Sequence, residues 1–450
     1  MARAEKRTKT QSHPHNNAIT EDWTNMSNVA RGHRLIAGVA LATTAVLLTA
    51  ACSSGGTASS GGKVTIEFSQ WWGSELPKGD LQKIADEFHT KNPNITVKLL
   101  TEPYSSLQDQ TTTAGVSGTL ADVVGLDGAW VNNLVKQGAL DNLSTEIKST
   151  KYDDSQLASQ IQIAGSTYMI PVVNFVYPLF TNDDLLAQAG VTTPPTTRDE
   201  FLADAKAITE KTSAKGWILP LGTTNPNGVQ NDVMSWLWAS GGSMLKKGQP
   251  DLTNTGVKSA VDYVKSLYDA KVVADGTFTL QEPDKVTQFT NGQVGMMIDS
   301  LAHITTIRQA NPNLKFSISA VPAADGYSGK RGIPYASWGI GVSNKSAHKA
   351  EAWKFVQYLM SKDVNANISS LAHGFPGNST ATPDFTGADP LYQQAFKIYQ
   401  AGYPANEFVG LPTSDQLMRD FDTAFQKTLN GDGSVDDMLT TTQASWKKAF

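Results

Sequence analysis

The sequence predicts an α/β protein in which parallel strands are joined by crossover helices. Short runs of β-branched and aromatic residues recur along the chain, and stretches with apolar residues at helical spacing separate them. This alternation is typical of βαβ units, which build a parallel sheet. The 450 residues, 40% of them hydrophobic and 18% charged, have the composition of a globular protein and room for two or three domains.

The N-terminal region has the anatomy of a secretory signal. Residues 35–51 carry no charge and follow Arg31, His33 and Arg34, so a basic segment precedes an apolar one. The apolar run of about 17 residues is short for a membrane span, which needs about 20; a plain transmembrane anchor is the alternative. A start at Met26 instead of Met1 would give a conventional signal.

Cys52, the only cysteine, lies where the apolar run ends. The stretch LTAAC at residues 48–52 resembles a bacterial lipobox, with Thr49 where leucine is usual. We expect Cys52 to be acylated as the mature N-terminus, each buried methylene contributing about 0.8 kcal/mol of membrane binding. Residues 53–62, rich in glycine and serine, form a flexible tether. A single cysteine excludes an internal disulfide and a thiolate-rich metal site, and no cofactor or metal is expected.

Charge excludes nucleic acid as a partner. The formal net charge of the whole chain is -5. Removal of residues 1–51 leaves 31 basic and 39 acidic residues, a net charge of -8. Such a chain presents no basic face to a phosphate backbone.

Three βα units follow the tether. Strands are expected at residues 63–72, 95–100 and 121–126, and helices at 81–92, after Tyr104 and at 131–137. In open α/β sheets ligands bind beyond the carboxyl ends of the strands. Those ends carry Trp71 and Trp72, then Glu102 and Tyr104, and finally Asp127 and Trp130. Aromatic and acidic residues at three successive strand ends are the most informative pattern in the sequence.

The remainder of the chain continues the alternation and then becomes helical. We expect strands at residues 167–182, 294–299 and 335–343, and another αβ unit at 217–228, whose exit loop holds Asn225, Asn227 and Asn231. Helices are expected at 183–189, 199–211, 232–240, 257–273, 347–362, 415–429 and 435–449. Thr197 is the expected N-cap of the helix at 199–211. No internal repeat is present.

The ordered motifs resemble the extracellular solute-binding proteins of ABC importers, family 1, which bind carbohydrates and are similar to maltose-binding protein. The resemblance spans nearly all of residues 63–450 and rests on LADVVGLDGAW, YMIPVVNFVYPLFTNDDLL, WLWASGG, FTNGQVGMMID and WGIGVSNKSAHKAEAWKFVQYLM.

The resemblance implies a two-lobed periplasmic-binding-protein-like fold of type II, with a ligand cleft between lobes joined by hinge strands. Residues 1–51 are the N-terminal extension and signal, 52–62 the tether, 63–172 lobe I, 173–333 lobe II, 334–372 a return to lobe I, and 373–450 C-terminal helices, mainly of lobe II. The hinges are expected at 171–175 and 333–337. The implied protein is a monomer, lipid-anchored outside the cytoplasmic membrane, which captures a sugar by hinge closure and delivers it to ABC permease subunits.

A sugar needs aromatic rings under its C–H face and polar side chains around its hydroxyl groups. The candidate ligand-binding residues are Trp71, Trp72, Tyr104, Asp127, Trp130, Asn174, Phe175, Asn231, Asp299, Ser300, His303, Tyr335, Trp338 and Phe375. Helix capping is the competing role for Asp127 and Asn231, and core packing for Trp130. The family often has an aromatic residue two positions after Ser300, whereas this chain has Ala302 followed by His303, which would partly replace that ring.

Other functions are weighed against sugar binding. A cell-surface glycosidase would need two carboxylates facing each other across a cleft, but the chain has no G-x-S-x-G, H-E-x-x-H or P-loop motif, so no enzymatic activity is expected. A structural or adhesive lipoprotein would not need aromatic residues at strand ends. A glycerol-phosphate-type ligand would require lysine or arginine in the cleft, and no candidate position holds either.

Overall fold

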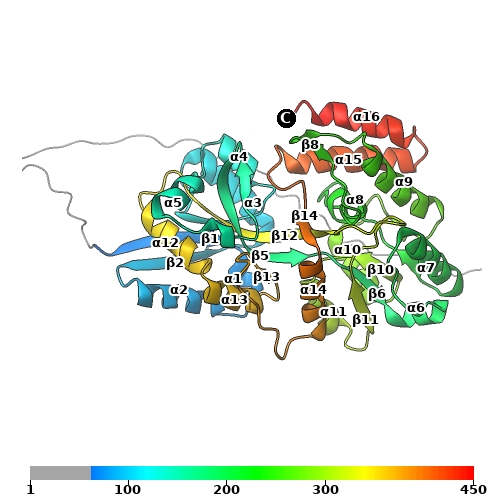
Figure 1. The fold of residues 1–450 in the computed structure, drawn as a ribbon, viewed down its shortest axis with the longest axis horizontal. Helices are drawn as coiled ribbons and strands as arrows, with labels where there is room; N and C mark the ends of the chain where they lie inside the picture. Colours follow the sequence, from blue (N-terminus) through cyan, green and yellow to red (C-terminus); the bar gives the residue numbers. More distant parts are fainter. Residues whose placement is uncertain (1–61) are drawn as a thin grey trace, which may run out of the picture. The chain divides into compact units, whose positions relative to one another are not determined.

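The computed structural model describes residues 62–450, which form a two-lobed α/β fold built on two separate sheets (Figure 1). The predicted α/β class and the two-lobed architecture are confirmed. Cys52, the signal segment and residues 53–61 of the tether lie outside the described residues. No helix of residues 62–450 is both long enough and apolar enough to cross a membrane.

Lobe I contains the larger sheet, whose main path runs β13-β5-β12-β3-β1-β2. Its strands are β1 (Val64–Gln70), β2 (Ile95–Thr101), β3 (Val123–Leu126), β4 (Ile161–Ile163), β5 (Ser166–Val176), β12 (Gly332–Val342), β13 (Phe375–Pro376) and β14 (Tyr403–Ala405). The strands β2, β1 and β3 are parallel, as the alternation of strands and helices predicts, whereas β12 is antiparallel to both β3 and β5. The carboxyl ends of the three parallel strands therefore share one edge.

Lobe II contains a four-stranded sheet in the order β11-β6-β10-β7. Its strands are β6 (Leu179–Asn182), β7 (Lys215–Trp217), β10 (Val294–Ile298) and β11 (Phe316–Ser319), and a separate hairpin is formed by β8 (Leu245–Lys246) and β9 (Gln249–Pro250). Every residue of β10 is buried because helices cover both faces of the sheet. The ladder of β7 ends at Trp217.

Helices surround both sheets. The helices are α1 (Trp72–Glu75), α2 (Asp80–Lys91), α3 (Tyr104–Ser117), α4 (Val131–Lys136), α5 (Leu143–Thr150), α6 (Asp183–Ala189), α7 (Arg198–Lys211), α8 (Met234–Trp238), α9 (Thr255–Asp269), α10 (Glu282–Thr290), α11 (His303–Ala310), α12 (Lys349–Leu359), α13 (Lys362–Leu371), α14 (Pro390–Ala401), α15 (Ser414–Leu429) and α16 (Val435–Trp446). A 3₁₀ turn spans Asp154–Gln156 and a π-helical turn, η2, spans Val229–Val233. The capping box of Thr197 and Glu200 at the start of α7 confirms the predicted N-cap.

The segment 167–182, expected as one strand, is two strands in different sheets. The strand β5 pairs with β12 up to Val176, and β6 begins at Leu179 in the sheet of lobe II. Pro178 between them has no N–H to donate to a ladder, whereas its carbonyl accepts from the amide of Asp299 at 3.2 Å. The chain therefore passes from one lobe to the other at Tyr177 and Pro178, just after the predicted hinge.

Pro171 lies within β5, where a proline would interrupt the ladder. The register of β5 on β12 shifts between Trp338 and Gly339, so that Trp338 pairs with Val173 and Gly339 with Pro171. Such a bulge accommodates a residue without an N–H.

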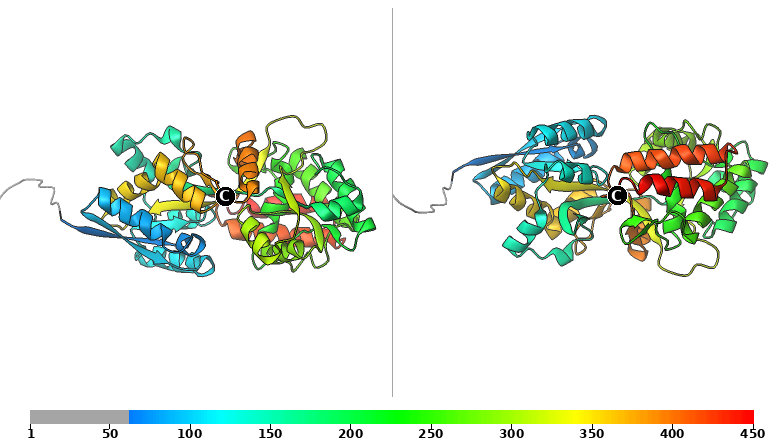
Figure 2. Two further views of the ribbon diagram at one scale, coloured as in Figure 1. Left: turned by 90° about the horizontal axis from the view of Figure 1, so that it is seen from below. Right: turned by 90° about the horizontal axis from the view of Figure 1, so that it is seen from above.

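The C-terminal helices pack mainly on lobe II. Figure 2 shows α15 and α16 side by side. Leu417, Phe421 and Phe425 form the buried face of α15, and the indole of Trp446 donates to the carbonyl of Leu417 at 3.1 Å. Each such side chain, fully buried, contributes about 1.5–3 kcal/mol, so this helix pair is an integral part of the lobe.

Candidate functional site

The carboxyl ends of the three parallel strands of lobe I carry an aromatic cluster, defined here as Trp71, Tyr104 and Trp130. The ring centroids are 5.3 Å apart for Trp71 and Tyr104, 5.7 Å for Trp71 and Trp130, and 5.4 Å for Tyr104 and Trp130. Each residue lies where a strand passes into the following helix. The structure thus brings these three sequence-predicted residues together.

Tyr104 is the open member of the aromatic cluster. Its side chain is 45% exposed, whereas Trp71 and Trp130 are only 3% and 4% exposed. Burial nevertheless raises the pKa of the Tyr104 phenol well above its usual value, and the charges of Asp127, Asp415 and Glu282 add to this. Since Glu282 belongs to α10 and Asp415 to α15, the open edge of the cluster faces lobe II and the C-terminal helices.

Asp127 both supports Tyr104 and begins the turn into α4. Its carboxylate accepts from the Tyr104 hydroxyl at 3.2 Å and from the amide of Ala129 at 2.9 Å. Burial raises the pKa of this carboxyl, an effect that both hydrogen bonds oppose. The bond to Ala129 closes the turn before α4, whose N-cap is Trp130, so Asp127 is not the cap of that helix, and its other carboxylate oxygen faces the aromatic cluster.

A second aromatic group contains Trp72, Trp338 and Phe175. Trp72 is fully buried and stacks on Trp338 with centroids 5.5 Å apart and planes 10° apart. Phe175 lies against Trp338 at 5.2 Å. In this arrangement the Trp72 ring has no surface exposed to a ligand and packs against the ring of Trp338.

Glu75 is a site residue that the sequence did not single out. It accepts from the indole N–H of Trp338 at 3.1 Å and lies one helical turn after Trp71. Burial raises the pKa of its carboxyl, opposed by the Trp338 hydrogen bond and by the charge of His303 in lobe II. Glu75 could have been identified from the sequence, because it is an acidic residue about one helical turn after the two tryptophans at the end of the first strand.

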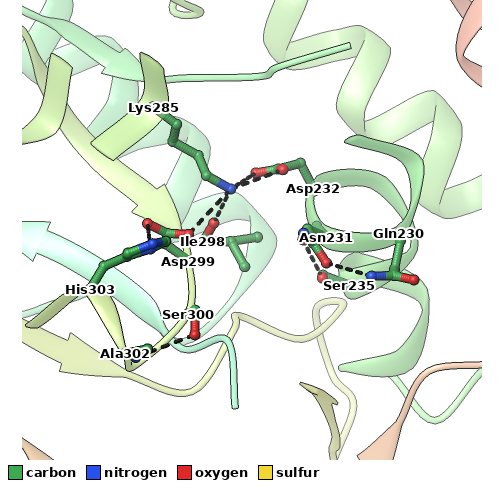
Figure 3. Close-up of polar contacts among 10 residues, drawn as sticks. All are labelled: Gln230, Asn231, Asp232, Ser235, Lys285, Ile298, Asp299, Ser300, Ala302 and His303. Atoms are coloured by element: carbon green, nitrogen blue, oxygen red, sulfur yellow. Dashed lines mark hydrogen bonds and ion pairs between the residues drawn. The ribbon is translucent and has the colours of Figure 1, made fainter. Parts of the chain in front are cut away.

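Lobe II contributes a buried ionic network, defined here as Asp232, Lys285, Asp299 and His303 (Figure 3). The Lys285 ammonium donates to both carboxylate oxygens of Asp232 at 3.2 and 3.4 Å and to the Ile298 carbonyl at 2.6 Å. It lies 3.8 Å from Asp299 Oδ1. Lys285 and Asp299 are completely buried and Asp232 is 1% exposed, so these three charged groups are shielded from water.

His303 links the ionic network to the surface. Its Nδ1 lies 2.9 Å from Asp299 Oδ2, and its side chain is 30% exposed. Burial alone would lower the pKa of His303, but the charge of Asp299 and their hydrogen bond raise it to about 9. Burial raises the pKa of Asp232 to about 7 against the opposing charge of Lys285.

Glu282, the first residue of α10, adds a third carboxylate beside Asp299. Burial, and then the negative charge of Asp299, raise the pKa of Glu282. Burial opposes ionisation of Asp299 as well, but the charges of His303 and Lys285 hold the pKa of that carboxyl below its usual value. Donor atoms of Glu282, Asp299 and His303 all lie within 4.8 Å of one another, so these three residues are the candidate metal ligands.

Asn231 and Asp232 both lie in the π-helical turn η2. The Asn231 side-chain oxygen accepts from Gln230 at 3.1 Å, and its backbone carbonyl accepts from the Ser235 hydroxyl (Figure 3). The expected helix at 232–240 therefore starts with a wider turn. Ser300 follows Asp299 and accepts from the amide of Ala302 at 3.3 Å, so its hydroxyl begins the turn into α11.

The remaining sequence-predicted residues lie along the hinge strands. Asn174 is 1% exposed and donates to the Pro376 carbonyl at 3.4 Å. Tyr335, opposite Val176, is 7% exposed, and burial raises the pKa of its phenol to about 12. Phe375 is fully buried among Phe385, Phe396 and Tyr399. In this arrangement Phe375 is a core residue without surface for a ligand.

Tyr177 lies close to both the aromatic cluster and the ionic network. The pKa of its phenol is raised well above the usual value, first by burial and then by the charges of Glu282, Asp299, Tyr104 and Asp127. The aromatic cluster and the ionic network thus lie within electrostatic range of one side chain at the passage between lobes. Farther along, Gln108 of α3 donates to Asp415 of α15 at 2.9 Å.

The carboxylates around these groups outnumber the cations. Glu75, Asp127 and Asp415 accept hydrogen bonds from neutral donors, and Glu282 lies beside Asp299 and His303. Lys285 and His303 already have the partners Asp232 and Asp299. Such a site suits a ligand with hydroxyl or other donor groups and disfavours an anion. A surface hollow of about 460 Å³ between α15 and α16 is lined by none of the predicted site residues.

Comparisons with known proteins agree on one family. The profile described as bacterial extracellular solute-binding protein matches residues 73–366. A binding protein of Brucella abortus (strain 2308) is 28% identical over 303 residues, 66% of this chain and 72% of the relative. The multiple sugar-binding protein of Streptococcus mutans is 23% identical over 329 residues, 70% and 76% of the two chains. The solved cyclic alpha-maltosyl-1,6-maltose binding protein of Arthrobacter globiformis has a TM-score of 0.74 at 20% identity, covering 86% of this chain and 99% of that one.

Proposed function

Because this chain belongs to the bacterial extracellular solute-binding protein family, we propose that it captures a sugar or oligosaccharide by hinge closure and delivers it to an ABC permease. The observation that carries the proposal is the aromatic cluster at the ends of β1, β2 and β3. Tyr104 is its open ring, and the Asp127 carboxylate lies directly beside the phenol. A ring face beside hydrogen-bond acceptors matches a sugar, which has one apolar face and a rim of hydroxyls.

The neighbouring carboxylates favour a hydroxyl-bearing ligand over a phosphate ester. Lys285, the buried cation of this region, is already held by Asp232 and by the Ile298 carbonyl. A phosphate would face Asp127, Glu282 and Asp415, and a phosphate is bound best by an unpaired guanidinium or ammonium, which Lys285 is not. Names of relatives support the same ligand class, since one is a sugar-binding protein and one a maltosyl-maltose binding protein.

The way the lobes are joined supports hinge closure. The paired strands β5 and β12 belong to the sheet of lobe I, and the chain enters lobe II just beyond Val176. A ligand that contacts Tyr104 in lobe I and the exposed side of His303 in lobe II favours the closed state by the energy of the contacts it makes only there. Release to a permease then requires only that the lobes reopen.

Acylation of Cys52 is the remaining part of the proposal. The lipobox-like LTAAC and the glycine- and serine-rich tether support an anchor on the outer face of the membrane. A lipid anchor would keep the protein close to its permease while the tether allows it to turn. Metabolic labelling with a radioactive fatty acid tests this, and Cys52→Ser must lose the label.

A thermal-shift screen tests the ligand class. We expect neutral oligosaccharides to raise the melting temperature, because a ligand that binds only the native state stabilises it, and phosphate esters to have no effect. Tyr104→Phe removes the hydrogen bond to Asp127 and should weaken the shift. Tyr327→Phe, which deletes a hydroxyl bonded to the Lys330 carbonyl, is the matched control. A shift with phosphate esters alone would overturn the sugar assignment, and hydrolysis of the sugar would indicate an enzyme.

A further inference from the structure

Three side chains with metal-binding chemistry converge in lobe II. Glu282 is the first residue of α10, Asp299 follows β10, and His303 is the first residue of α11. One donor atom from each lies within 4.8 Å of the others. Figure 3 shows the His303 ring and the Asp299 carboxylate directed at each other, with Nδ1 and Oδ2 2.9 Å apart.

The charges at this point do not balance within the protein. Asp232, Asp299 and Glu282 supply three carboxylates, Lys285 supplies one ammonium, and His303 supplies an imidazolium beside Asp299. The ammonium is committed to Asp232 and to the Ile298 carbonyl. One negative charge therefore remains beside buried groups, and an uncompensated buried charge is costly. A divalent cation that takes the place of the His303 proton would neutralise the group.

An unpartnered atom points to the same conclusion. Asp299 is completely buried, and its Oδ1 has no hydrogen-bond partner among residues 62–450. The Lys285 ammonium, at 3.8 Å, is too far away to donate to it. Buried carboxylate oxygens normally have a donor or a metal ion beside them, so this oxygen lacks a partner that a bound ion can supply.

We propose that Glu282, Asp299 and His303 bind a divalent transition-metal ion of the zinc class. One imidazole nitrogen and two carboxylates form a donor set that suits zinc and its neighbours, whereas calcium takes six to eight oxygen ligands. Three protein ligands leave a coordination position for water or another ligand. The site does not depend on the proposed sugar-binding function.

Calorimetric titration of the full, untagged chain with zinc chloride tests the proposal, after EDTA treatment and dialysis. We expect a zinc event that His303→Gln and Glu282→Gln each weaken by at least the 10- to 100-fold typical of lost supporting contacts. Magnesium and calcium should bind far more weakly. His13, His15 and His33 remain in every variant, so any zinc bound by the N-terminal segment is common to all titrations. His348→Gln, a histidine change in lobe I, is the matched control and should leave the event unchanged.

Cobalt provides an independent measurement if a variant folds poorly. The wild-type chain loaded with Co²⁺ should show visible d–d absorption, and this absorption should disappear when zinc displaces the cobalt. The His303→Gln variant should lack the absorption, and circular dichroism should confirm that this variant is folded. Absence of zinc binding, or zinc binding equal in wild type and His303→Gln, overturns the proposal. The carboxyl groups of Glu282 and Asp299 would then share a proton instead.

Discussion

Replacing Lys285 by methionine tests the ionic network most severely. The ammonium is fully buried, donates to three acceptors and adjoins a second carboxylate. Methionine has a similar shape without the charge, so Asp232 and Asp299 would remain buried without their cation. Breaking a buried pair in this way typically destabilises a protein by about 3–5 kcal/mol. We expect a loss of that size in the free energy of unfolding at pH 8.

The double variant Asp232→Asn/Lys285→Met separates the charge effect from the packing effect. Removing both partners leaves no unpaired charge at Asp232, and such replacements are often nearly neutral. The double variant should therefore be more stable than Lys285→Met alone. The coupling energy, which is the loss in the double variant minus the sum of the two single losses, should have a magnitude of about 0.5–3 kcal/mol, as is typical of contacting residues. If it were as unstable as the sum of its single changes, the pair would not interact as described.

The penalty of Lys285→Met should depend on pH. The pKa of Asp232 is about 7 with Lys285 present, against an ordinary value of 3.8, and it should rise further without the ammonium that lowers it. A carboxyl with a raised folded-state pKa stabilises the protein below its unfolded pKa, and loses that contribution as pH rises through the folded value. The loss relative to wild type should be smaller at pH 5 than at pH 8.

Urea denaturation with EDTA present, at both pH values, measures these differences. The free energy of unfolding of lobe II is compared between the wild type, Lys285→Met and the double variant under the same conditions. A loss below about 1 kcal/mol at pH 8, where a typical surface ion pair lies, or an equal loss at both pH values, would refute the reasoning.

Three further changes test other parts of the structure. Thr197→Ala removes the capping box of α7 and should cost about 0.5–2 kcal/mol in urea denaturation; no change would mean that the cap is not used. Burial raises the pKa of Asp204 to about 6, so Asp204→Asn should raise the melting temperature slightly at pH 8 but not at pH 3, and a lowered melting temperature at pH 8 would reverse the sign. Trp338→Ala should lose about 3–5 kcal/mol, because it removes the stack on Trp72 and the Glu75 hydrogen bond; retention of wild-type stability would show that this stack is dispensable.

The sequence predicted the arrangement of the first lobe well because its signals are local. Alternating β-branched strands and amphipathic helices give parallel strands, whose carboxyl ends meet at one edge. Trp71, Tyr104 and Trp130 are far apart in sequence but follow three such strands, so their convergence could be anticipated. The Thr197 cap was predictable for the same reason, since its hydrogen bonds involve only nearby residues.

Features that depend on the second sheet were not predictable from local pattern. Residues 167–182 are apolar almost throughout, and nothing in that run says that β5 and β6 belong to different sheets. Only the position of Tyr177 and Pro178 opposite Pro334 and Asp299 reveals the break. Similarly, a one-residue widening at Val229–Val233 leaves no mark on helical periodicity.

The sequence also did not predict which individual side chains are buried. Lys285 looks like a surface residue of a short helix, yet Asp232 and Asp299 from other elements hold it in the interior. Trp72 and Phe375 were candidate ligand contacts, but their rings lie against Trp338 and Phe396. The direction in which such a ring points depends on packing across the fold, which a single sequence does not contain.

Lobe closure around a bound sugar can be measured directly with spin labels. Cys52 is the only native cysteine, so labels can be placed at Val116→Cys, on the exposed end of α3, and at Lys447→Cys, just beyond α16, in a Cys52→Ser background. Adding the oligosaccharide that raises the melting temperature should shorten the distance between the labels. An unchanged distance distribution at saturating sugar would contradict ligand capture by two closing lobes.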